Sequence, residues 1–335
     1  MKKKIGGILQ KIGLKKKAVQ LNLSFSNKHK KIERDIRMFL IPRLVKKRSK
    51  SGYYAIDFDS DWNGFGSRVI KTLEILLYCE TNKLIPVIKF SYREKIKPPT
   101  DYFREIFFYK TTLQIDEKKL RFTKIRDNDE LKWEEDYNQK LHLSFAKSLF
   151  DEYLGINKDI LEEVEMFKNS WFKNKKVLGV HFRGTDKAGE APLVTKEKLL
   201  QHINEIINEE NDFNIIFLST DDEKIIKYLE SAELRLPLIY RKDILRSTDG
   251  NQFHRIKENS KSLINRDAIV NCLLLSDCNF LLKTASILSD CSVVFNPTIR
   301  VKVISFPHSH ELTWWPATEI KQNQENNIYA VVATK

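Results

Sequence analysis

The 335-residue sequence lacks several features that would assign it quickly to a class of protein. No window approaches about 18 consecutive apolar residues, so we expect no transmembrane helix. No sustained apolar segment or small-residue cleavage site follows the basic start, so we expect no secretory signal. The four cysteines lie among apolar residues and form no CxxC pair, which argues against a zinc site and predicts buried, reduced thiols in a cytosolic protein. Hydrophobic residues make up 41% of the chain, enough for folded cores.

The net charge of +13 belongs to one end of the chain. Residues 1–50 hold 17 Lys and Arg against Glu33 and Asp35, a net +15, so the remainder carries −2. Four apolar residues of this tail recur at the spacing of one helical face: Ile5, Ile8, Leu9 and Ile12. A basic amphipathic segment suits an anionic membrane surface, with a solvated tail or a nucleic-acid-binding arm as the alternatives. The basic-aromatic interleaving of an RNA-binding sheet is absent, which disfavours the last.

The first half of the body predicts a strand, loop, helix and strand. YYAIDF (53–58) has the pattern of a strand, and a loop with two glycines leads to a helix with an apolar face from Val69 to Leu77. LIPVIKF (84–90) is a second strand, and residues 139–173 are expected to be helical. The region from about 91 to 135 has no clear pattern. This order is typical of an α/β domain.

A second series of strands and helices begins at residue 176. Strands are expected at VLGVHF, FNIIFLS, LPLIYR, NFLLKT and VVFNP. Helices are expected at 195–209, 222–231, about 262–277 and from near Ser286. Such alternation implies parallel strands with right-handed crossovers. We predict a basic tail over 1–50 and two Rossmann-like domains, over 51–170 and 171–335, with a cleft between them.

Polar residues follow three strands of the second series, and open parallel sheets bind ligands beyond the carboxyl ends of their strands. Arg183 follows the first strand, and its guanidinium could form paired hydrogen bonds to a diphosphate. The alternative is a structural salt bridge to Asp186. Thr284 and Ser286 follow a later strand and open a helix, where free N–H groups and a hydroxyl can hold phosphate. Helix capping by Ser286 is the simpler interpretation.

The stretch STDDE (219–223) has a similar double interpretation. Ser219 or Thr220 can cap a helix with acids in its first turn. Capping explains one or two of these residues, but explains the pair Asp221 and Asp222 at a strand's carboxyl end less well. We therefore include both aspartates among the candidate site residues.

The loop DWNGFGSR (61–68) resembles a glycine-rich nucleotide turn but lacks the third glycine of GxGxxG. Gly64 and Gly66 still allow close backbone approach, with Arg68 directly after them. The nearby aspartates do not fit a calcium loop, because Trp62 and Arg68 occupy its sixth and twelfth positions. A metal-nucleotide site built on an AspXAsp pair in 57–61 is a disfavoured alternative. No nucleophile elbow or HExxH motif is present, and three histidines receive no role: His254, His308 and His310.

Three segments together resemble a known family. GVHFRGTDKAGE (179–190) is similar to the HxRxTDK signature of the α1,6-fucosyltransferases, which include the nodulation-factor fucosyltransferases. IIFLSTDDEKIIK (215–227) resembles the strand and Thr-Asp-Asp turn of that family. NRDAIVNCLLLSDCNFLLKTASILSD (265–290) resembles its helix, strand and Thr-x-Ser turn. GFGSRVIKTLEILLYC (64–79) is a looser parallel. The specific matches cover about residues 176–292 in the family's order.

The resemblance implies a GT-B fold, with two Rossmann-like domains whose parallel sheets face a cleft, and GDP-fucose as co-substrate without a cofactor or metal. It makes 51–170 the acceptor-side domain and 171–335 the domain that binds the GDP-sugar donor. It places His181 near the guanosine, Arg183 and Ser286 at the diphosphate, and Asp221 and Asp222 in the donor or acceptor pocket. The resemblance also covers the remaining donor-side candidates, which are Lys187 and Thr284. Asn271 stands where the family carries a guanine-reading aspartate. Glu190 falls one residue closer to TDK than the family's proposed base, and Asp186 is a further catalytic candidate.

We therefore expect an inverting, metal-independent glycosyltransferase that transfers fucose from GDP-fucose to a bacterial surface glycan or its lipid-linked precursor. A carboxylate would act as base, and Arg183 would stabilise the departing diphosphate. The basic tail suits a cytoplasmic enzyme of polysaccharide biosynthesis, peripheral at the inner face of the membrane. The alternatives are another GDP-sugar as donor or, in a different class, a nucleic-acid-binding protein that acts through its N-terminus.

Overall fold

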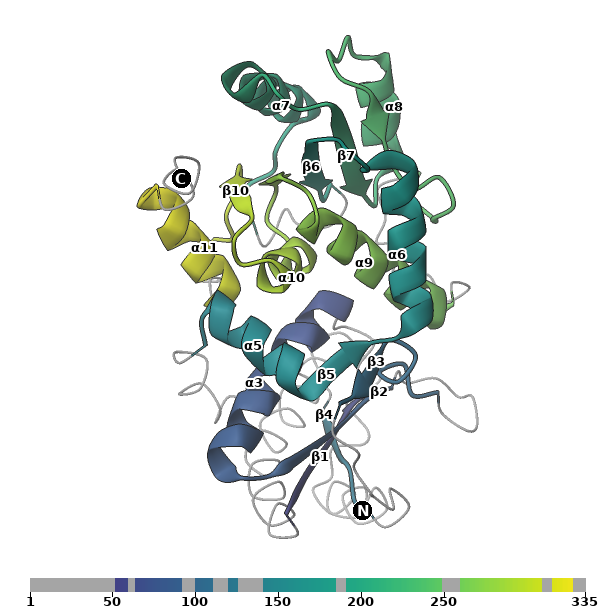
Figure 1. The fold of residues 1–335 in the computed structure, drawn as a ribbon, viewed down its shortest axis with the longest axis vertical. Helices are drawn as coiled ribbons and strands as arrows, with labels where there is room; N and C mark the ends of the chain where they lie inside the picture. Colours follow the sequence, from purple (N-terminus) through teal and green to yellow (C-terminus); the bar gives the residue numbers. More distant parts are fainter. Residues whose placement is uncertain are drawn as a thin grey trace, which may run out of the picture.

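The computed structural model describes residues 52–59, 64–91, 100–110, 120–125, 141–184, 191–248, 260–308 and 315–327. This part of the chain forms two parallel sheets at opposite ends of an elongated molecule, with helices between them (Figure 1). The predicted basic tail over 1–50 lies outside the described residues. No helix in the described ranges combines the length and apolarity that a bilayer-spanning segment needs.

The first sheet has the strand order β2-β1-β4 and is parallel throughout. Its strands are β1 (Tyr53–Asp59), β2 (Ile85–Ser91) and β4 (Thr123–Ile125). Helix α3 (Phe65–Asn82) joins β1 to β2 and buries its apolar face, as its periodicity predicts. It ends at Lys83, whose backbone adopts the left-handed conformation and returns the chain to β2. A short antiparallel pair, β3 (Phe107–Tyr109) and β5 (Leu154–Ile156), lies beside this sheet (Figure 1).

The second sheet has five parallel strands in the order β10-β9-β6-β7-β8. They are β6 (Val177–Phe182), β7 (Ile215–Thr220), β8 (Leu238–Ile239), β9 (Phe280–Lys283) and β10 (Arg300–Val303). Strands β6, β7 and β8 follow one another toward one edge of the sheet. The chain then returns to the other side of β6, where β9 and β10 extend to the opposite edge. The order therefore reverses between β6 and β9, which makes that point the topological switch of a doubly wound sheet. Ligands of such sheets bind outside the carboxyl ends of the strands at this point.

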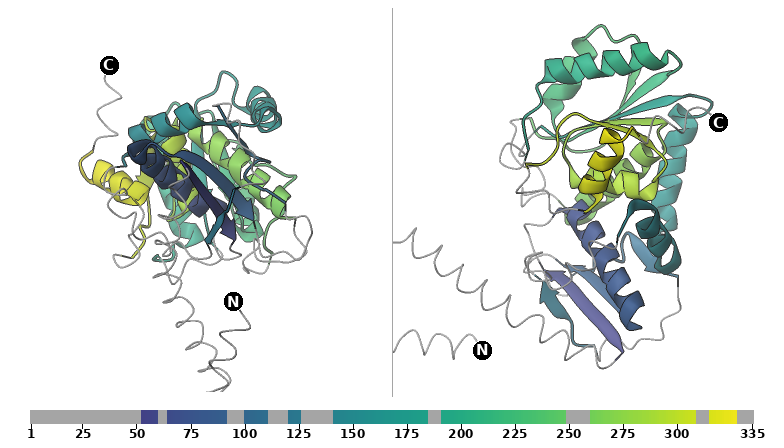
Figure 2. Two further views of the ribbon diagram at one scale, coloured as in Figure 1. Left: turned by 90° about the horizontal axis from the view of Figure 1, so that it is seen from below. Right: turned by 90° about the vertical axis from the view of Figure 1, so that its left-hand side faces the viewer.

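Helices cover both faces of the second sheet (Figure 2). The outer face packs on α7 (Lys196–Glu210) and α8 (Glu223–Ser231) in a separate hydrophobic cluster. The inner face packs on α9 (Lys261–Ser276) and α10 (Ile287–Phe295). This inner cluster continues without a break to the first sheet through α3 and α5 (Leu143–Tyr153). Both halves of the chain thus share one core.

Two further helices connect the halves. Helix α6 (Lys158–Trp171) leads from β5 to β6 and packs against α9. Helix α11 (Trp315–Glu325) packs on α10, and its Glu319 carboxylate accepts a 2.7 Å hydrogen bond from the backbone N–H of Leu143. This bond satisfies a free donor at the start of α5. The predicted domain boundary at 170/171 falls inside α6 and stays a prediction.

Some predicted elements were wrong in type or extent. VVFNP is not a strand, because Val293 and Val294 belong to α10 and the last strand comes later, at β10. Most of α10 is buried, including its polar residues Ser289, Asp290 and Ser292, and the helix ends in the apolar run 293–295, which has the pattern of a short buried strand. LPLIYR pairs over only two residues as β8. The segment expected to be helical over 139–173 contains β5 between its two helices. All four cysteines are buried and free, as predicted.

Candidate active site at the switch point of the second sheet

The ends of β6 and β9 are joined by a hydrogen bond at the switch point. The backbone N–H of Arg183 donates to Thr284 Oγ1 over 3.0 Å, and Thr284 N–H donates to the carbonyl of His181 over 3.0 Å. Thr284 is buried, whereas the Arg183 side chain keeps 22% of its surface exposed. Thr284 thus fixes the backbone from which the Arg183 guanidinium reaches toward solvent.

Ser286 occupies the N-cap position of α10, but it does not cap the helix. No side-chain capping hydrogen bond forms there, and Ser286 Oγ is buried without a partner among the described residues. The simpler interpretation of Ser286 as a helix cap is therefore wrong. A buried, unpartnered hydroxyl is costly unless a ligand or water completes its bonding. Together with the free N–H groups of the first helical turn, it forms a potential anion site.

An open cavity of about 370 Å³ lies at this carboxyl edge. Arg183, Gly184, Thr284 and Ser305 form its wall on the sheet side. Residues 191–195, the first residue of α7 and the start of α8 form the opposite wall. The cavity has the size of a site for one small ligand or part of a larger one.

Asp221 and Asp222 have different roles. Asp222 is the N-cap of α8, and its Oδ1 accepts a 2.9 Å hydrogen bond from the Lys224 N–H. The prediction that Ser219 or Thr220 caps this helix is therefore wrong, although Thr220 Oγ1 accepts from the Asp222 N–H at 3.1 Å. Asp221 Oδ2 lies 3.9 Å from Arg183 Nε, so an aspartate of the STDD turn contacts the residue that is predicted to bind the diphosphate.

His181 lies on the inner face of the second sheet, opposite the cavity wall. Strand alternation places Phe182 on the outer face, in the cluster with α7 and α8, and turns His181 toward α9 and α10. The ring is buried, and its Nδ1 has no partner among the described residues. Burial, and to a smaller extent the nearby cations of Lys283 and Arg183, lower the pKa of His181 to about 3. The imidazole is therefore neutral at physiological pH.

A buried ion pair lies beside His181, and sequence reasoning missed it. Lys283 is the register partner of His181 on β9, and its Nζ lies 2.7 Å from Asp290 Oδ1 on α10. Both side chains are at most 4% exposed. A lysine at the end of the apolar strand NFLL requires a partner, and the acid seven residues later, in an apolar segment, was the available signal. The pair ties the first turn of α10 to the sheet beneath Ser286.

The glycine-rich loop of the first half contacts the start of α10, which is the candidate phosphate-binding element of the second half. A Cβ on Gly66 would lie 3.0 Å from the backbone N of Leu288 and 3.1 Å from the carbonyl C of Ile287. The first turns of α3 and α10 are therefore in direct backbone contact, which requires glycine at position 66. No atom lies within 4 Å of a Cβ built on Gly64. The loop that was only weakly suggested by sequence thus borders the start of α10.

Arg68 is fully buried in the first half and binds carbonyl groups there. Its Nη1 donates to the carbonyls of Phe58 at 3.2 Å and Ser91 at 3.3 Å, and its guanidinium lies over the Phe90 ring. These contacts hold the carboxyl ends of β1 and β2 together. Arg68 acts here as a structural support of the loop.

The aspartates of β1 form ion pairs with a lysine. Lys124 Nζ lies 3.7 Å from Asp57 and 3.3 Å from Asp59, and Asp57 also accepts a 2.5 Å hydrogen bond from Ser91 Oγ. Burial raises the pKa of Asp57.

Within the described ranges, no three His, Cys, Asp or Glu side chains are arranged to hold a metal ion.

Four other predicted residues are not placed at this edge. Asp186, Lys187 and Glu190 lie outside the described residues. Asn271 is buried in α9, which ends next to the amino end of β9, so it lies below the carboxyl edge. Its role as a guanine reader stays a prediction.

Comparisons with known proteins identify the fold. No protein-family model and no curated protein sequence matches the chain. NodZ α-1,6-fucosyltransferase co-crystallised with GDP has a similar fold, with a TM-score of 0.52 at 13% identity over 75% of this chain and 93% of that chain. Fucosyltransferase NodZ from Bradyrhizobium gives a TM-score of 0.51 at 11% identity, covering 74% and 94%. The predicted fold class, an α/β protein of GT-B type with parallel sheets, is confirmed.

Proposed function

We propose that the chain is a glycosyltransferase that takes GDP-fucose as its donor. The observation that carries this proposal is the arrangement of Arg183 and Ser286 on the two sides of the switch point between β6 and β9. Arg183 supplies a cation on one side, and Ser286 supplies a buried hydroxyl at the start of α10 on the other. A diphosphate can accept hydrogen bonds from both groups. The likeness to the NodZ structure with GDP supports the choice of nucleotide.

In the proposed chemistry, Arg183 and the start of α10 bind the departing diphosphate. Negative charge grows on the leaving phosphate during transfer, and the Arg183 guanidinium and the α10 N-terminus stabilise charge at that place. In this proposal these groups supply the electrostatic role themselves, and the metal independence implied by the family resemblance stays a prediction. The neutral ring of His181 fits a hydrogen bond to an uncharged group, such as a nucleoside hydroxyl or base edge.

An acceptor hydroxyl needs a base on the opposite side of the sugar for transfer with inversion. Glu190 and Asp186 are the candidates from the sequence, and Lys187 would accompany them in the same loop. Asp221 Oδ2 lies 3.9 Å from Arg183 Nε, and Asp222 is held as a helix cap. In this proposal Asp221 orients Arg183, and one of the two loop carboxylates takes the proton.

The proposed acceptor is a surface glycan or its lipid-linked precursor. The support is the basic amphipathic tail, which would hold the enzyme at the anionic inner face of a membrane. The remaining alternative for the donor is another GDP-sugar, because Arg183 and Ser286 are proposed to bind the diphosphate, which all GDP-sugars share. A nucleic-acid-binding role rests only on the tail and gains nothing from the site geometry.

Thermal unfolding with a panel of nucleotide sugars tests the proposed donor. A ligand that binds only the folded state, at a free concentration of 100 times its Kd, stabilises that state by about 2.7 kcal/mol and raises Tm. GDP-fucose should raise Tm more than GDP-mannose, and UDP-glucose should not raise it. Equal protection by GDP-mannose would favour the alternative donor, and protection by none of them would refute the nucleotide-sugar site.

A further inference from the structure

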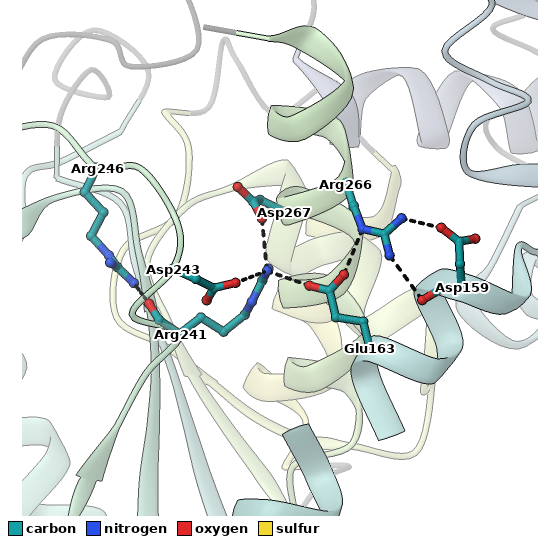
Figure 3. Close-up of polar contacts among 7 residues, drawn as sticks. All are labelled: Asp159, Glu163, Arg241, Asp243, Arg246, Arg266 and Asp267. Atoms are coloured by element: carbon teal, nitrogen blue, oxygen red, sulfur yellow. Dashed lines mark hydrogen bonds and ion pairs between the residues drawn. The ribbon is translucent and has the colours of Figure 1, made fainter. Parts of the chain in front are cut away.

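A buried arginine lies at the centre of an ionic cluster between α6, α9 and the segment after β8 (Figure 3). Arg241 Nη2 lies 2.6 Å from Glu163 of α6, 3.0 Å from Asp267 of α9 and 3.2 Å from Asp243 of its own segment. Its side chain is only 4% exposed. Arg266 of α9 extends the cluster, because its Nε lies 2.8 Å from Glu163 Oε2.

Stability alone is a weak explanation for this cluster. The attraction within a buried ion pair commonly does little more than offset the free energy of its desolvation. Apolar residues can often replace such a pair without loss of protein stability. Burial raises the pKa of Asp267 to about 6 although Arg241 lies beside it, so desolvation outweighs attraction at this carboxylate. A cluster with this balance is better suited to fixing one geometry than to holding the fold together.

The segment that Arg241 anchors ends against the Asp221–Asp222 turn. Arg246 donates to the carbonyls of Arg241 and Ile244, which folds residues 241–246 into a compact loop. The next residue, Ser247, pairs with the turn in both directions. Its N–H donates to the carbonyl of Asp221 over 2.9 Å, and its carbonyl accepts from the Glu223 N–H over 3.0 Å.

The turn that Ser247 holds carries two groups of the candidate site. Asp221 Oδ2 lies 3.9 Å from the Arg183 guanidinium, and Asp222 caps α8 at the cavity wall. A continuous series of contacts therefore runs from Arg241 through Ser247 to Asp221 and Arg183. We propose that Arg241 is a positioning residue for the donor site: α6 and α9 hold it, and through its loop it sets the orientation of Asp221 toward Arg183.

This inference rests on the proposed function, and GDP binding separates the two. Isothermal titration calorimetry with GDP is first carried out on the unaltered protein, since lack of binding there refutes the proposed function and not the relay. Arg241→Gln, which removes the charge at the centre, should then weaken GDP binding by roughly 2- to 30-fold, the range typical of residues that couple to a site without touching it.

Arg266→Gln is the matched control. It removes a charge from the same cluster and a contact of Glu163, but Arg266 is not part of the loop that reaches Ser247. GDP affinity should change by less than about twofold in Arg266→Gln, even where both variants lower Tm. Equal GDP affinity in Arg241→Gln and the unaltered protein would overturn the proposal, as would equal losses in the two variants.

A second variant keeps the test decisive if Arg241→Gln does not fold. Arg241→Lys keeps the charge but lacks the planar fork that faces three carboxylates, so a partial loss of GDP affinity is expected. Hydrogen exchange provides the readout that a purely structural role would not move: the Ser247 amide should exchange faster in Arg241→Lys and not in Arg266→Gln. Unchanged Ser247 protection and unchanged GDP affinity in Arg241→Lys would overturn the proposal.

Discussion

The backbone N–H of Arg183 donates a 3.0 Å hydrogen bond to Thr284 Oγ1, and this bond joins the two strands at which the sheet order reverses. Thr284 follows β9, and Arg183 follows β6, about a hundred residues earlier in the chain. The proposed diphosphate site therefore depends on a threonine whose hydroxyl is used inside the protein.

Thr284→Val keeps the shape of the side chain and removes the acceptor. The buried N–H of Arg183 then loses its partner, which should cost about 1–3 kcal/mol of stability and displace Arg183. GDP affinity measured by calorimetry should fall, while Thr284→Ser, which retains the hydroxyl, should bind GDP nearly as well as the unaltered protein. Unchanged GDP affinity in Thr284→Val would show that this bond does not place Arg183.

Gly66→Ala should separate the starts of α3 and α10. The new methyl group would meet backbone atoms of Ile287 and Leu288 at 3.0–3.1 Å, so the helices must shift, at a cost of about 1–3 kcal/mol. Gly64→Ala is the control, because nothing lies within 4 Å of its Cβ and its φ of −66° suits alanine. Urea unfolding should show a lower stability for Gly66→Ala only; equal effects of both changes would contradict the close contact.

Lys283→Met should strongly destabilise the protein, because it leaves the Asp290 carboxylate buried without its partner. Removing one partner of a buried pair typically costs about 3–5 kcal/mol, whereas replacing both partners by apolar residues can be close to neutral. The double variant Lys283→Met/Asp290→Leu should therefore recover most of the free energy of unfolding. A single variant within about 1 kcal/mol of the unaltered protein would show that the pair is not desolvated.

His181→Gln should change how stability depends on pH. The pKa of His181 is lowered in the folded state, so its contribution is complete above pH 6.5, the pKa of the unfolded state, and is lost as pH falls toward about 3. The unaltered protein should lose about 1.4 kcal/mol per pH unit from this ring between pH 6.5 and 4.5, a loss that the glutamine variant lacks. Urea unfolding at pH 7.0, 5.5 and 4.5 measures the difference, and parallel stability curves would contradict a buried neutral ring.

The doubly wound sheet could be predicted from sequence because its central strands carry their own signals. VLGVHF, FNIIFLS and NFLLKT are apolar runs bounded by turns and followed by helical patterns, and β6, β7 and β9 lie there. The polar residues after them could therefore be placed at one edge without knowledge of the structure. The fold class followed from the same alternation.

Other features depended on contacts between distant segments. Helix α10 lies between two layers and ends in the apolar run 293–295, a pattern that sequence alone does not distinguish from a short buried strand. The use of Asp222 as the cap of α8 depends on the exact end of β7, and helix and strand ends are poorly marked in sequence. The partners of Arg241 come from 78 residues before it and from α9 after it, a separation that no local pattern reveals.

Calorimetric titration of GDP-fucose into the unaltered protein and into Arg183→Ala tests whether Arg183 binds the donor diphosphate. We expect binding by the unaltered protein and a loss of at least about tenfold in Arg183→Ala, since hydrogen bonds to a charged group contribute about 1.5–3 kcal/mol each. Arg235→Ala, which removes an exposed arginine that binds Asn208, is the control and should bind as tightly as the unaltered protein. Equal affinity in Arg183→Ala and Arg235→Ala would contradict a donor diphosphate held at the switch point between β6 and β9.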